Sequence, residues 1–285
     1  MLATPAALLG AKLFNELKKE SAIAAGLSDD LCSLFEENFE KGMDKLWDGD
    51  PVKVTPLQID IARYFTKFKI GENNLYRLLI QTVKKSKKKA TFSTTNYDLL
   101  LEQAINAEGF LISYTGLPVE KDNLSLLKIH GSCNFIPAIK PDQIKGIGFV
   151  VPKDGTSILN APVRPTSAEE AKKFCDEADA IAPAIAVYSE GKQVLHCDKF
   201  VKEQQAQWEA AIKKASKIFV IGLRVIEHDD HIWGVLSKNK AWLGYVGLEP
   251  KEFTEWSNKV GRKNSYIVSD TFENSISVIE RRLKL

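Results

Sequence analysis

The feature that most restricts the fold is an alternation of short β-rich runs with helical patterns, which begins near residue 90. The β-rich runs are 90–94, 110–114, 126–129, 185–188, 217–221, 243–246 and 266–268. Between or after them lie helical patterns over 99–107, 198–215 and 271–283. Strands that alternate with helices are typical of a sheet covered by helices on both faces. The pattern therefore predicts an α/β fold with a doubly wound parallel sheet.

The chain before residue 90 has a different pattern, in which apolar residues recur at helical spacing. Thr4 before Pro5 predicts the start of one helix. Ser28 predicts the cap of a second helix, whose apolar stripe runs to Trp47. A Thr-Pro pair at 55–56 repeats the start signal. This part of the chain is therefore expected to be helical.

Breaks in these two patterns predict the domain boundaries. Residues 20–89 are expected to form a helical insertion. The proline-rich stretch 136–180, with a short helix near its end, is expected to be a second, smaller insertion. The α/β domain would then be built from 1–19, 90–135 and 181–285.

Composition excludes several classes of protein. Lys and Arg together number 39 against 37 Asp and Glu, and the net charge of +2 is too small to attract nucleic acid or anionic lipid by itself. No apolar run approaches the roughly 20 residues of a membrane-spanning helix. The four cysteines lie far apart without C-x-x-C spacing, which argues against a disulfide framework or a zinc ribbon. We expect a cytoplasmic protein with no membrane contact and no metal.

The segment 84–89, with five lysines and Ser86, is the single low-complexity patch. We interpret it as a solvated helix end, because aromatic residues for base stacking are missing nearby and the whole chain is nearly neutral. A direct role in nucleic-acid binding is disfavoured and stays open.

Ligands of doubly wound sheets bind beyond the carboxyl ends of the strands, so polar residues at those ends are the first candidates. The first such place is Thr94, Thr95, Asn96 and Asp98, where hydroxyls, an amide and a carboxylate offer the donors and acceptors that a ribose needs. The alternative is that Thr95, Asn96 or Asp98 only caps the following helix.

Two further places follow later β-rich runs. His130 ends an apolar run before Gly131 and Ser132, where an imidazole can act as a general base. Gly222 ends another run before Arg224, and this pair suits a nucleotide phosphate or ribose. A metal site at the H-D-D-H stretch 228–231 is the weaker alternative, because no third ligand stands at a recognised spacing and an aspartate there can cap a helix.

Four blocks of the chain resemble, in order and spacing, the sirtuin superfamily. They are T-T-N-Y-D at 94–98, K-I-H-G-S at 128–132, P-A-I-A-V-Y-S-E at 183–190 and V-I-G at 220–222. The resemblance is strongest to the bacterial branch of sirtuin-like NAD hydrolases that act in defence against phage. It covers about residues 90–135 and 181–285.

The resemblance implies a Rossmann-like domain that takes NAD as its substrate and needs no metal. Its catalytic residues would be His130, Asn96 and Asp98, with the imidazole as base. Residues that would contact the NAD are Thr94, Thr95, Gly131, Ser132, Gly222, Arg224, Asp270, Thr271 and Phe272. Within this set, Gly222 would lie against the adenine-side ribose, and 270–272 would lie near the adenine.

The chain departs from the family's pattern in two places. The stretch L-L-G-A at 8–11 has one glycine where sirtuins have a strand and a Gly-Ala-Gly loop for the pyrophosphate, so no residue is assigned to that cradle. The deacylase branch usually carries a zinc ribbon with two C-x-x-C pairs, and none is present here. This favours NAD hydrolysis over protein-lysine deacylation, which is kept as the alternative.

The resemblance also implies partners. Members of the defence branch often work with a ring ATPase or an Argonaute-type protein, and we expect a homo-oligomer, since subunit contacts are a simple means of gating a cleft. A further alternative is a catalytically degenerate nucleotide-sensing or assembly subunit, in which the apolar stripe over 31–47 binds another protein.

Overall fold

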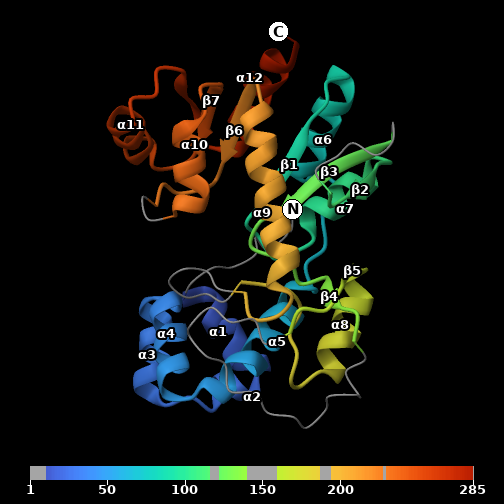
Figure 1. Ribbon diagram of the computed structural model, residues 1–285, viewed down its shortest axis with the longest axis vertical. Helices are drawn as coiled ribbons and strands as arrows, with labels where there is room; N and C mark the ends of the chain where they lie inside the picture. Colours follow the sequence, from blue (N-terminus) through green and yellow to red (C-terminus); the bar gives the residue numbers. More distant parts are fainter. Residues whose placement is uncertain (1–10, 116–121, 140–158, 187–193, 227–228, 285) are drawn as a thin grey trace. The chain divides into compact units, whose positions relative to one another are not determined.

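The computed structural model describes residues 11–115, 122–139, 159–186, 194–226 and 229–284 (Figure 1). It divides into two compact units, each of which is described by itself. Unit 1 consists of Met1–Ile70, Thr94–Leu100 and Lys128–Glu203. Unit 2 consists of Gly71–Ser93, Leu101–Leu127 and Gln204–Leu285.

The N-terminal part of unit 1 is helical, as the apolar spacing predicts. Its helices are α1 (Ala11–Glu20), α2 (Ala22–Ala25), α3 (Asp29–Glu37), α4 (Phe39–Gly49), the short 3₁₀ helix η1 (Pro51–Lys53) and α5 (Val54–Phe65). The core of this bundle is aromatic. The rings of Phe14 and Phe35 stack with centroids 4.5 Å apart, and Phe39 meets Phe35 edge-on at 5.1 Å.

The second helix predicted from the apolar stripe is two helices, broken at Asn38. Asn38 is extended (φ −155°), and its side chain accepts a hydrogen bond from the Lys41 backbone N–H at 3.1 Å, which caps α4. A Cβ atom on Gly42 would lie 2.5 Å from the Phe35 ring. The stripe is therefore buried by folding back on itself, and periodicity alone does not reveal the turn.

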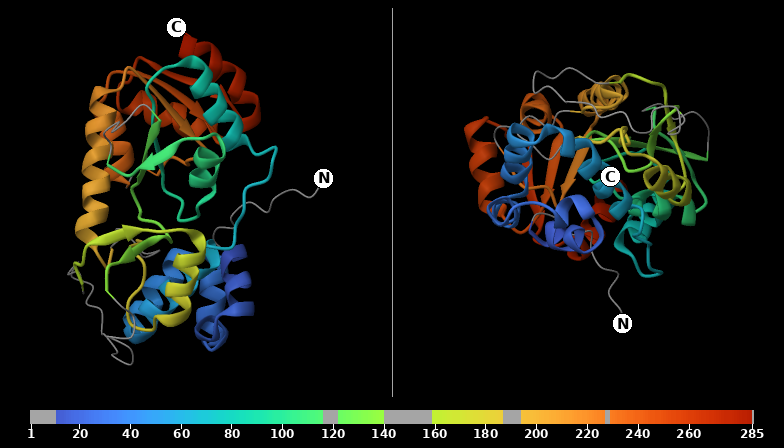
Figure 2. Two further views of the ribbon diagram at one scale, coloured as in Figure 1. Left: turned by 90° about the vertical axis from the view of Figure 1, so that its right-hand side faces the viewer. Right: turned by 90° about the horizontal axis from the view of Figure 1, so that it is seen from below.

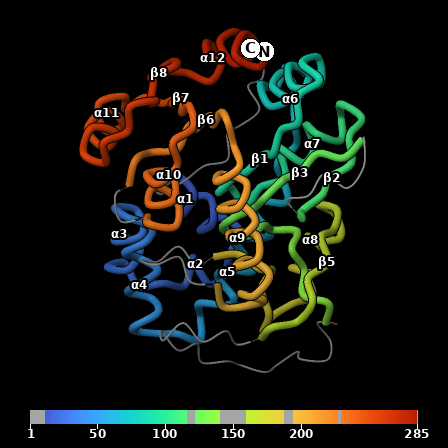
Figure 3. Tube along the Cα trace, turned by 45° about the horizontal axis from the view of Figure 1, so that its top comes forward, coloured from blue at the N-terminus to red at the C-terminus, as the bar shows by residue number. Residues whose placement is uncertain are grey.

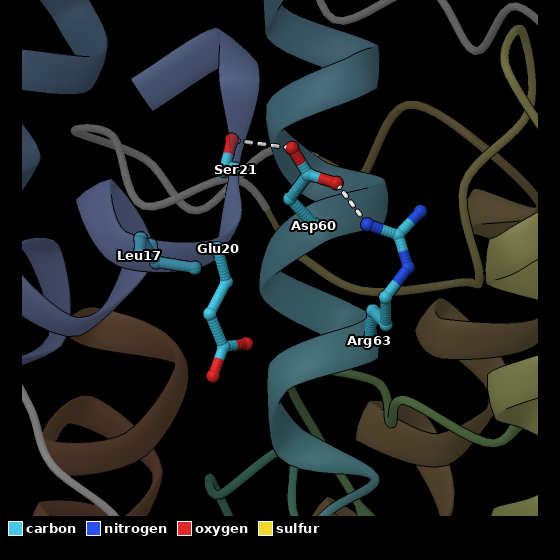
Figure 4. Close-up of a pocket in the computed structure, with 5 residues that line it drawn as sticks. All are labelled: Leu17, Glu20, Ser21, Asp60 and Arg63. Atoms are coloured by element: carbon cyan, nitrogen blue, oxygen red, sulfur yellow. Dashed lines mark hydrogen bonds and ion pairs between the residues drawn. The ribbon is translucent and has the colours of Figure 1, made fainter. Parts of the chain in front are cut away.

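A polar network ties α5 to its neighbours (Figure 4). Asp60 accepts hydrogen bonds from Ser21, the cap of α2, and from Arg63. Arg63 also donates to the Cys175 carbonyl at 2.6 Å and pairs with Asp176 at 3.0 Å, both at the end of α8 (Ala168–Glu177). A cavity of about 20 Å³ beside the network is lined by Leu17, Glu20, Ser21, Asp60 and Arg63. This volume suits one water molecule.

Unit 1 also contains a small antiparallel pair that the sequence pattern does not predict. Strand β4 (Phe135–Pro137) pairs with β5 (Val163–Pro165). Both strands end in proline, a residue that is largely confined to edge strands because it cannot donate to the ladder. The β-rich run predicted over 185–188 forms isolated bridges at Ile185 and Ala186, and its remaining residues lie outside the described residues.

Unit 2 holds most of the predicted parallel strands. One sheet has the order β1-β3-β2, from β1 (Thr91–Thr94), β2 (Leu111–Ser113) and β3 (Asn123–Lys128). The other has the order β6-β7-β8, from β6 (Lys217–Ile221), β7 (Trp242–Val246) and β8 (Ser265–Ser269) (Figure 3). The pairs β2–β3, β6–β7 and β7–β8 are parallel. Within the described ranges no ladder joins the two sheets, so the expected single sheet is present as two three-stranded sheets.

The remaining helices surround these strands or follow them. They are α6 (Leu75–Ser86), α7 (Leu100–Ala107), α9 (Asp198–Lys214), the π-helical turn η3 (Asp230–Gly234), α10 (Val235–Lys238), α11 (Pro250–Lys259) and α12 (Phe272–Lys284). Helices α6 and α12 share a core cluster of Leu79, Ile276 and Ile279, against which Phe92 of β1 and Phe219 of β6 pack. The mixed α/β fold with parallel strands is thus confirmed. In the part of the chain that the structure describes, no helix has the length and apolarity needed to cross a membrane.

Candidate functional site

The loop between β1 and α7 is ordered by its own polar side chains. Thr94 Oγ1 accepts a hydrogen bond from the Asn96 backbone N–H at 3.0 Å, and Asp98 Oδ1 accepts one from the Leu100 backbone N–H at 3.0 Å. Asp98 therefore does cap the start of α7, as the alternative interpretation has it. Its second oxygen, Oδ2, is buried and has no hydrogen-bond partner among the described residues. The carboxylate can serve a second purpose besides capping.

Asn96 is half-buried in the same loop. Its side-chain amide makes no hydrogen bond within the described ranges, although its backbone N–H does. An amide in this state can both donate to and accept from a bound molecule. Asn96 and Asp98 thus offer unused polar atoms at the carboxyl end of β1.

The loop after β3 is joined to this first loop by hydrogen bonds. The Ile129 backbone N–H donates to the Thr94 carbonyl at 3.3 Å, and the Cys133 backbone N–H donates to the Tyr97 carbonyl at 3.0 Å. Ser132 Oγ also donates to the Tyr97 carbonyl, at 3.4 Å. The two strand ends that carry the predicted amide, acid and imidazole are therefore adjoining loops of unit 1.

A third segment packs against both loops. The Ala186 backbone N–H donates to the His130 carbonyl at 2.9 Å, and the Tyr97 hydroxyl donates to the Ala186 carbonyl at 2.8 Å. Gly131 has φ +81°, and a Cβ atom there would lie 2.0 Å from the Ala184 carbonyl oxygen. His130, which is 8% exposed, is thus held in a backbone frame that only glycine permits at the next position.

Lys128 and Tyr97 belong to this frame and were missed from the sequence. Lys128 is fully buried, and its ammonium donates to the Asp98 carbonyl at 2.6 Å. The available signal was a lysine inside an apolar strand, two residues before His130. Residues two apart in a strand face the same side, and a buried ammonium needs acceptors. Tyr97 carried no comparable signal.

The predicted contacts in unit 2 are arranged differently. Gly222 has φ +68°, and a Cβ atom built on it would meet nothing within 4 Å. Arg224 is 71% exposed and forms an ion pair with Glu252 of α11, with 2.6 Å between Nη2 and Oε1. This hydrogen-bonded pair raises the pKa of Arg224 and lowers that of Glu252. The guanidinium expected to bind phosphate is therefore engaged by a carboxylate in this structure.

The 270–272 segment begins α12. Asp270 accepts a hydrogen bond from Ser269 Oγ at 3.2 Å, and bonds to Ser269 and Asn274 lower the pKa of its carboxyl. Thr271, which precedes the helix, accepts a hydrogen bond from the Asn274 backbone N–H at 3.3 Å and caps α12. The Phe272 ring packs into the core cluster, 5.8 Å from Tyr76. Its side chain thus has a structural role.

The stretch 228–231, which is the alternative metal site, is described only in part. His228 lies outside the described residues, and Asp229 precedes the π-helical turn, where its carbonyl accepts from Ile232 and Trp233. Among the described residues no three His, Cys, Asp or Glu side chains are grouped as metal ligands.

Comparison with protein families supports an assignment of this segment. The SIR2-like domain family matches residues 90–145, a segment that includes β1, β3 and β4 and the loops with Asn96, Asp98 and His130. No curated protein matches the chain. Members of the SIR2-like family are NAD-dependent enzymes. The match therefore supports a place in the sirtuin-like superfamily and an NAD-related activity for this segment.

Proposed function

We propose that the protein is an NAD⁺ glycohydrolase, which cleaves NAD⁺ to nicotinamide and ADP-ribose. One observation carries the proposal: two hydrogen-bonded loops at neighbouring strand ends hold the unpaired amide of Asn96, the buried Oδ2 of Asp98 and the imidazole of His130. The match of this same segment to the SIR2-like domain supports NAD as the substrate.

The chemistry of these groups suits the reaction. The bond between the ribose anomeric carbon and the nicotinamide nitrogen breaks, and its electron pair leaves with nicotinamide, which becomes neutral. Positive charge develops on the ribose, where the Asp98 carboxylate and the Asn96 amide oxygen stabilise it. The oxygen of a water molecule bonds to the anomeric carbon, and His130 accepts the proton that this water loses. The proton then passes to solvent.

The resemblance assigns further residues to the adenosine half of NAD⁺. Gly222 would let the backbone approach a ribose, since nothing lies within 4 Å of its missing Cβ. Asp270 and Thr271 would lie near the adenine, while Phe272 shapes the region through packing. Arg224 would have to exchange Glu252 for a phosphate oxygen before it contributes.

The decisive experiment measures nicotinamide release from NAD⁺ by chromatography with the purified chain. Asn96→Ala and His130→Asn are each expected to lower the rate by a factor of about 100 or more, because Asn96 stabilises the charge on the ribose and His130 accepts the proton of the attacking water. Asn106→Ala, which removes an exposed amide from α7, is the matched control and should leave the rate unchanged. A wild-type rate retained by His130→Asn would refute the proposal.

The same assay separates the alternatives. With an acetyl-lysine peptide present, a deacylase forms O-acetyl-ADP-ribose, whereas a glycohydrolase forms ADP-ribose alone. A degenerate nucleotide sensor would show an NAD-dependent rise in melting temperature without nicotinamide release. We further propose that the activity serves anti-phage defence and that a partner, a ring ATPase or an Argonaute-type protein, releases it. The assay is therefore run with and without a lysate of phage-infected cells.

A further inference from the structure

Helices α6 and α12 lie side by side in unit 2 and run in the same direction (Figures 1 and 2). Near their first turns, Tyr76 contacts Phe272 with ring centroids 5.8 Å apart. Near their last turns, the pKa of Glu280 is lowered by its hydrogen bond to Lys284 and also by the charge of Lys85. The two C-terminal ends therefore meet at one edge of unit 2.

That edge carries a high density of positive charge. The cations are Lys84, Lys85, Lys87, Lys88, Lys89, Arg281, Arg282 and Lys284. The acidic residues that face them already have partners. Glu280 pairs with Lys284 at 2.8 Å, and Glu108 pairs with Arg77 at 2.9 Å. The chain is nearly neutral as a whole, but this edge, which we call the basic edge, is not.

Aromatic side chains adjoin the basic edge, contrary to the sequence interpretation that none lie nearby. The Arg282 guanidinium lies 4.8 Å from the centroid of the Trp242 ring, and Trp242 stacks on Tyr266 at 5.8 Å with 17° between the ring planes. Tyr266 is 46% exposed. Lys217 Nζ donates to the Arg282 carbonyl at 2.7 Å, which fixes the end of α12 at the start of β6.

Helix capping explains part of this arrangement but not all of it. Lysines in the last turn of a helix interact favourably with the carbonyl end of the helix dipole, and Lys84 and Lys85 fit that role. Lys87 to Lys89 lie beyond the end of α6 and are exposed. Tyr266 is the exposed member of the aromatic stack, whereas Trp242 is half-buried and packs against Phe219 at 5.1 Å. The exposed lysines and the exposed ring together offer the two elements that single-stranded nucleic acid requires.

We propose that the basic edge binds single-stranded nucleic acid, with its phosphates on the lysines and arginines of α6 and α12 and one base stacked on Tyr266. The surface lies at the amino-terminal ends of the strands of unit 2, whereas Gly222 and Asp270 follow the carboxyl ends. The inference therefore stands independently of the proposed NAD⁺ cleavage.

Fluorescence anisotropy of the full chain with a labelled oligothymidylate of about 20 nucleotides tests the proposal. If about four phosphates are contacted, affinity should fall roughly 50-fold between about 50 and 200 mM salt. Reversing three exposed cations together (Lys88→Glu, Lys89→Glu and Arg281→Glu) should weaken binding at least tenfold at low salt. The control (Lys41→Glu, Lys45→Glu and Lys251→Glu) makes the same change in net charge on exposed lysines elsewhere and should weaken it less than twofold. No binding by the wild type, or equal losses in both triple variants, would overturn the proposal.

A second measurement tests the stacked base. Tyr266→Ala should weaken single-strand binding by about tenfold, while Tyr266→Phe, which keeps the ring, should bind like the wild type. The same measurement with an oligouridylate shows whether the basic edge prefers RNA or DNA. A duplex of the same length should be insensitive to Tyr266→Ala, because its bases are already stacked. An equal loss of affinity for duplex and single strand in Tyr266→Ala would overturn the role of Tyr266. Circular dichroism melting of each variant confirms that it is folded.

Discussion

Gly131 and Gly222 lie in the loops that follow strands β3 and β6, and the same sequence signal, a glycine after a strand, has a different structural meaning in each. Both glycines have positive φ, +81° and +68°. At Gly131 a Cβ atom would lie 2.0 Å from the Ala184 carbonyl oxygen, whereas at Gly222 it would meet nothing. A glycine after a strand thus marks a tightly packed joint in one loop and an open stretch of backbone in the other.

The largest expected effect tests this contrast directly. Gly131→Ala should destabilise the protein by about 4 kcal/mol, because it combines left-handed backbone strain with a clash against the backbone at Ala184. Gly222→Ala bears the strain alone and should cost about 1 kcal/mol. Urea unfolding measures both. Gly109→Ala, at φ +82° with open space around it, is the control and should match Gly222→Ala. Equal costs at 131 and 222 would contradict the comparison.

The next largest effect is a loss of folding stability at acidic pH. It is expected in unit 1, which contains both His196 and the Gly131 loop. Burial of His196 lowers the pKa of its imidazole from 6.5 to about 4. Between these two pH values the unfolded chain binds a proton that the folded chain does not, so stability falls as pH falls. The full loss is about 3 kcal/mol by pH 4 and is absent above about pH 6.5.

Hydrogen exchange and urea unfolding between pH 7 and 4 check this sign. Amides of unit 1 should lose protection before the Gly222 loop does. His196→Gln removes the titrating group, and although it is less stable throughout, its stability should vary less with pH over this range. A pH dependence that is unchanged in His196→Gln would show that other groups are responsible.

A smaller effect concerns the lysine that holds the first loop. Lys128→Met should cost about 2 kcal/mol, because it removes the ammonium that donates to the Asp98 carbonyl at 2.6 Å in a fully buried position. Lys217→Met is the matched control: it removes a similar bond to the Arg282 carbonyl, 2.7 Å, at a half-buried position, and should cost less than about 1 kcal/mol. Similar losses in thermal melts would contradict the importance of burial.

The sequence predicted the local elements of this fold better than their assembly. β6 begins and ends where its apolar run does, and α7, α9 and α12 lie within one residue of the predicted bounds, because short periodic runs between turn residues record local preferences. The single sheet was not found, since strand pairing depends on contacts between distant segments. The break at Asn38 was hidden by an apolar stripe that continues through it.

The candidate site shows the same division. Asn96, Asp98 and His130 were recognisable because polar residues interrupt apolar runs at strand ends, and the structure places their two loops together. Their catalytic roles stay a prediction. Lys128 was missed because hydrophobic patterning treats a lysine as an exposed residue, although its place inside an apolar strand was a signal that its ammonium is buried. The pairing of Arg224 with Glu252 could not be predicted from the sequence either, since the two residues are 28 positions apart.

The smallest effect is expected at Arg224, where the open loop has its charged side chain. Arg224→Gln should leave the melting temperature unchanged, because an exposed ion pair contributes little to stability. If Arg224 instead exchanges Glu252 for a phosphate of NAD⁺, the KM for NAD⁺ should rise several-fold while kcat stays the same, since a contact to the non-reacting phosphate contributes equally to substrate and transition state. Glu252→Gln frees the guanidinium from its competitor and should lower KM. A fall in kcat, or no change of KM in either variant, would place the phosphate elsewhere and leave the Gly222 loop as open backbone with no part in binding.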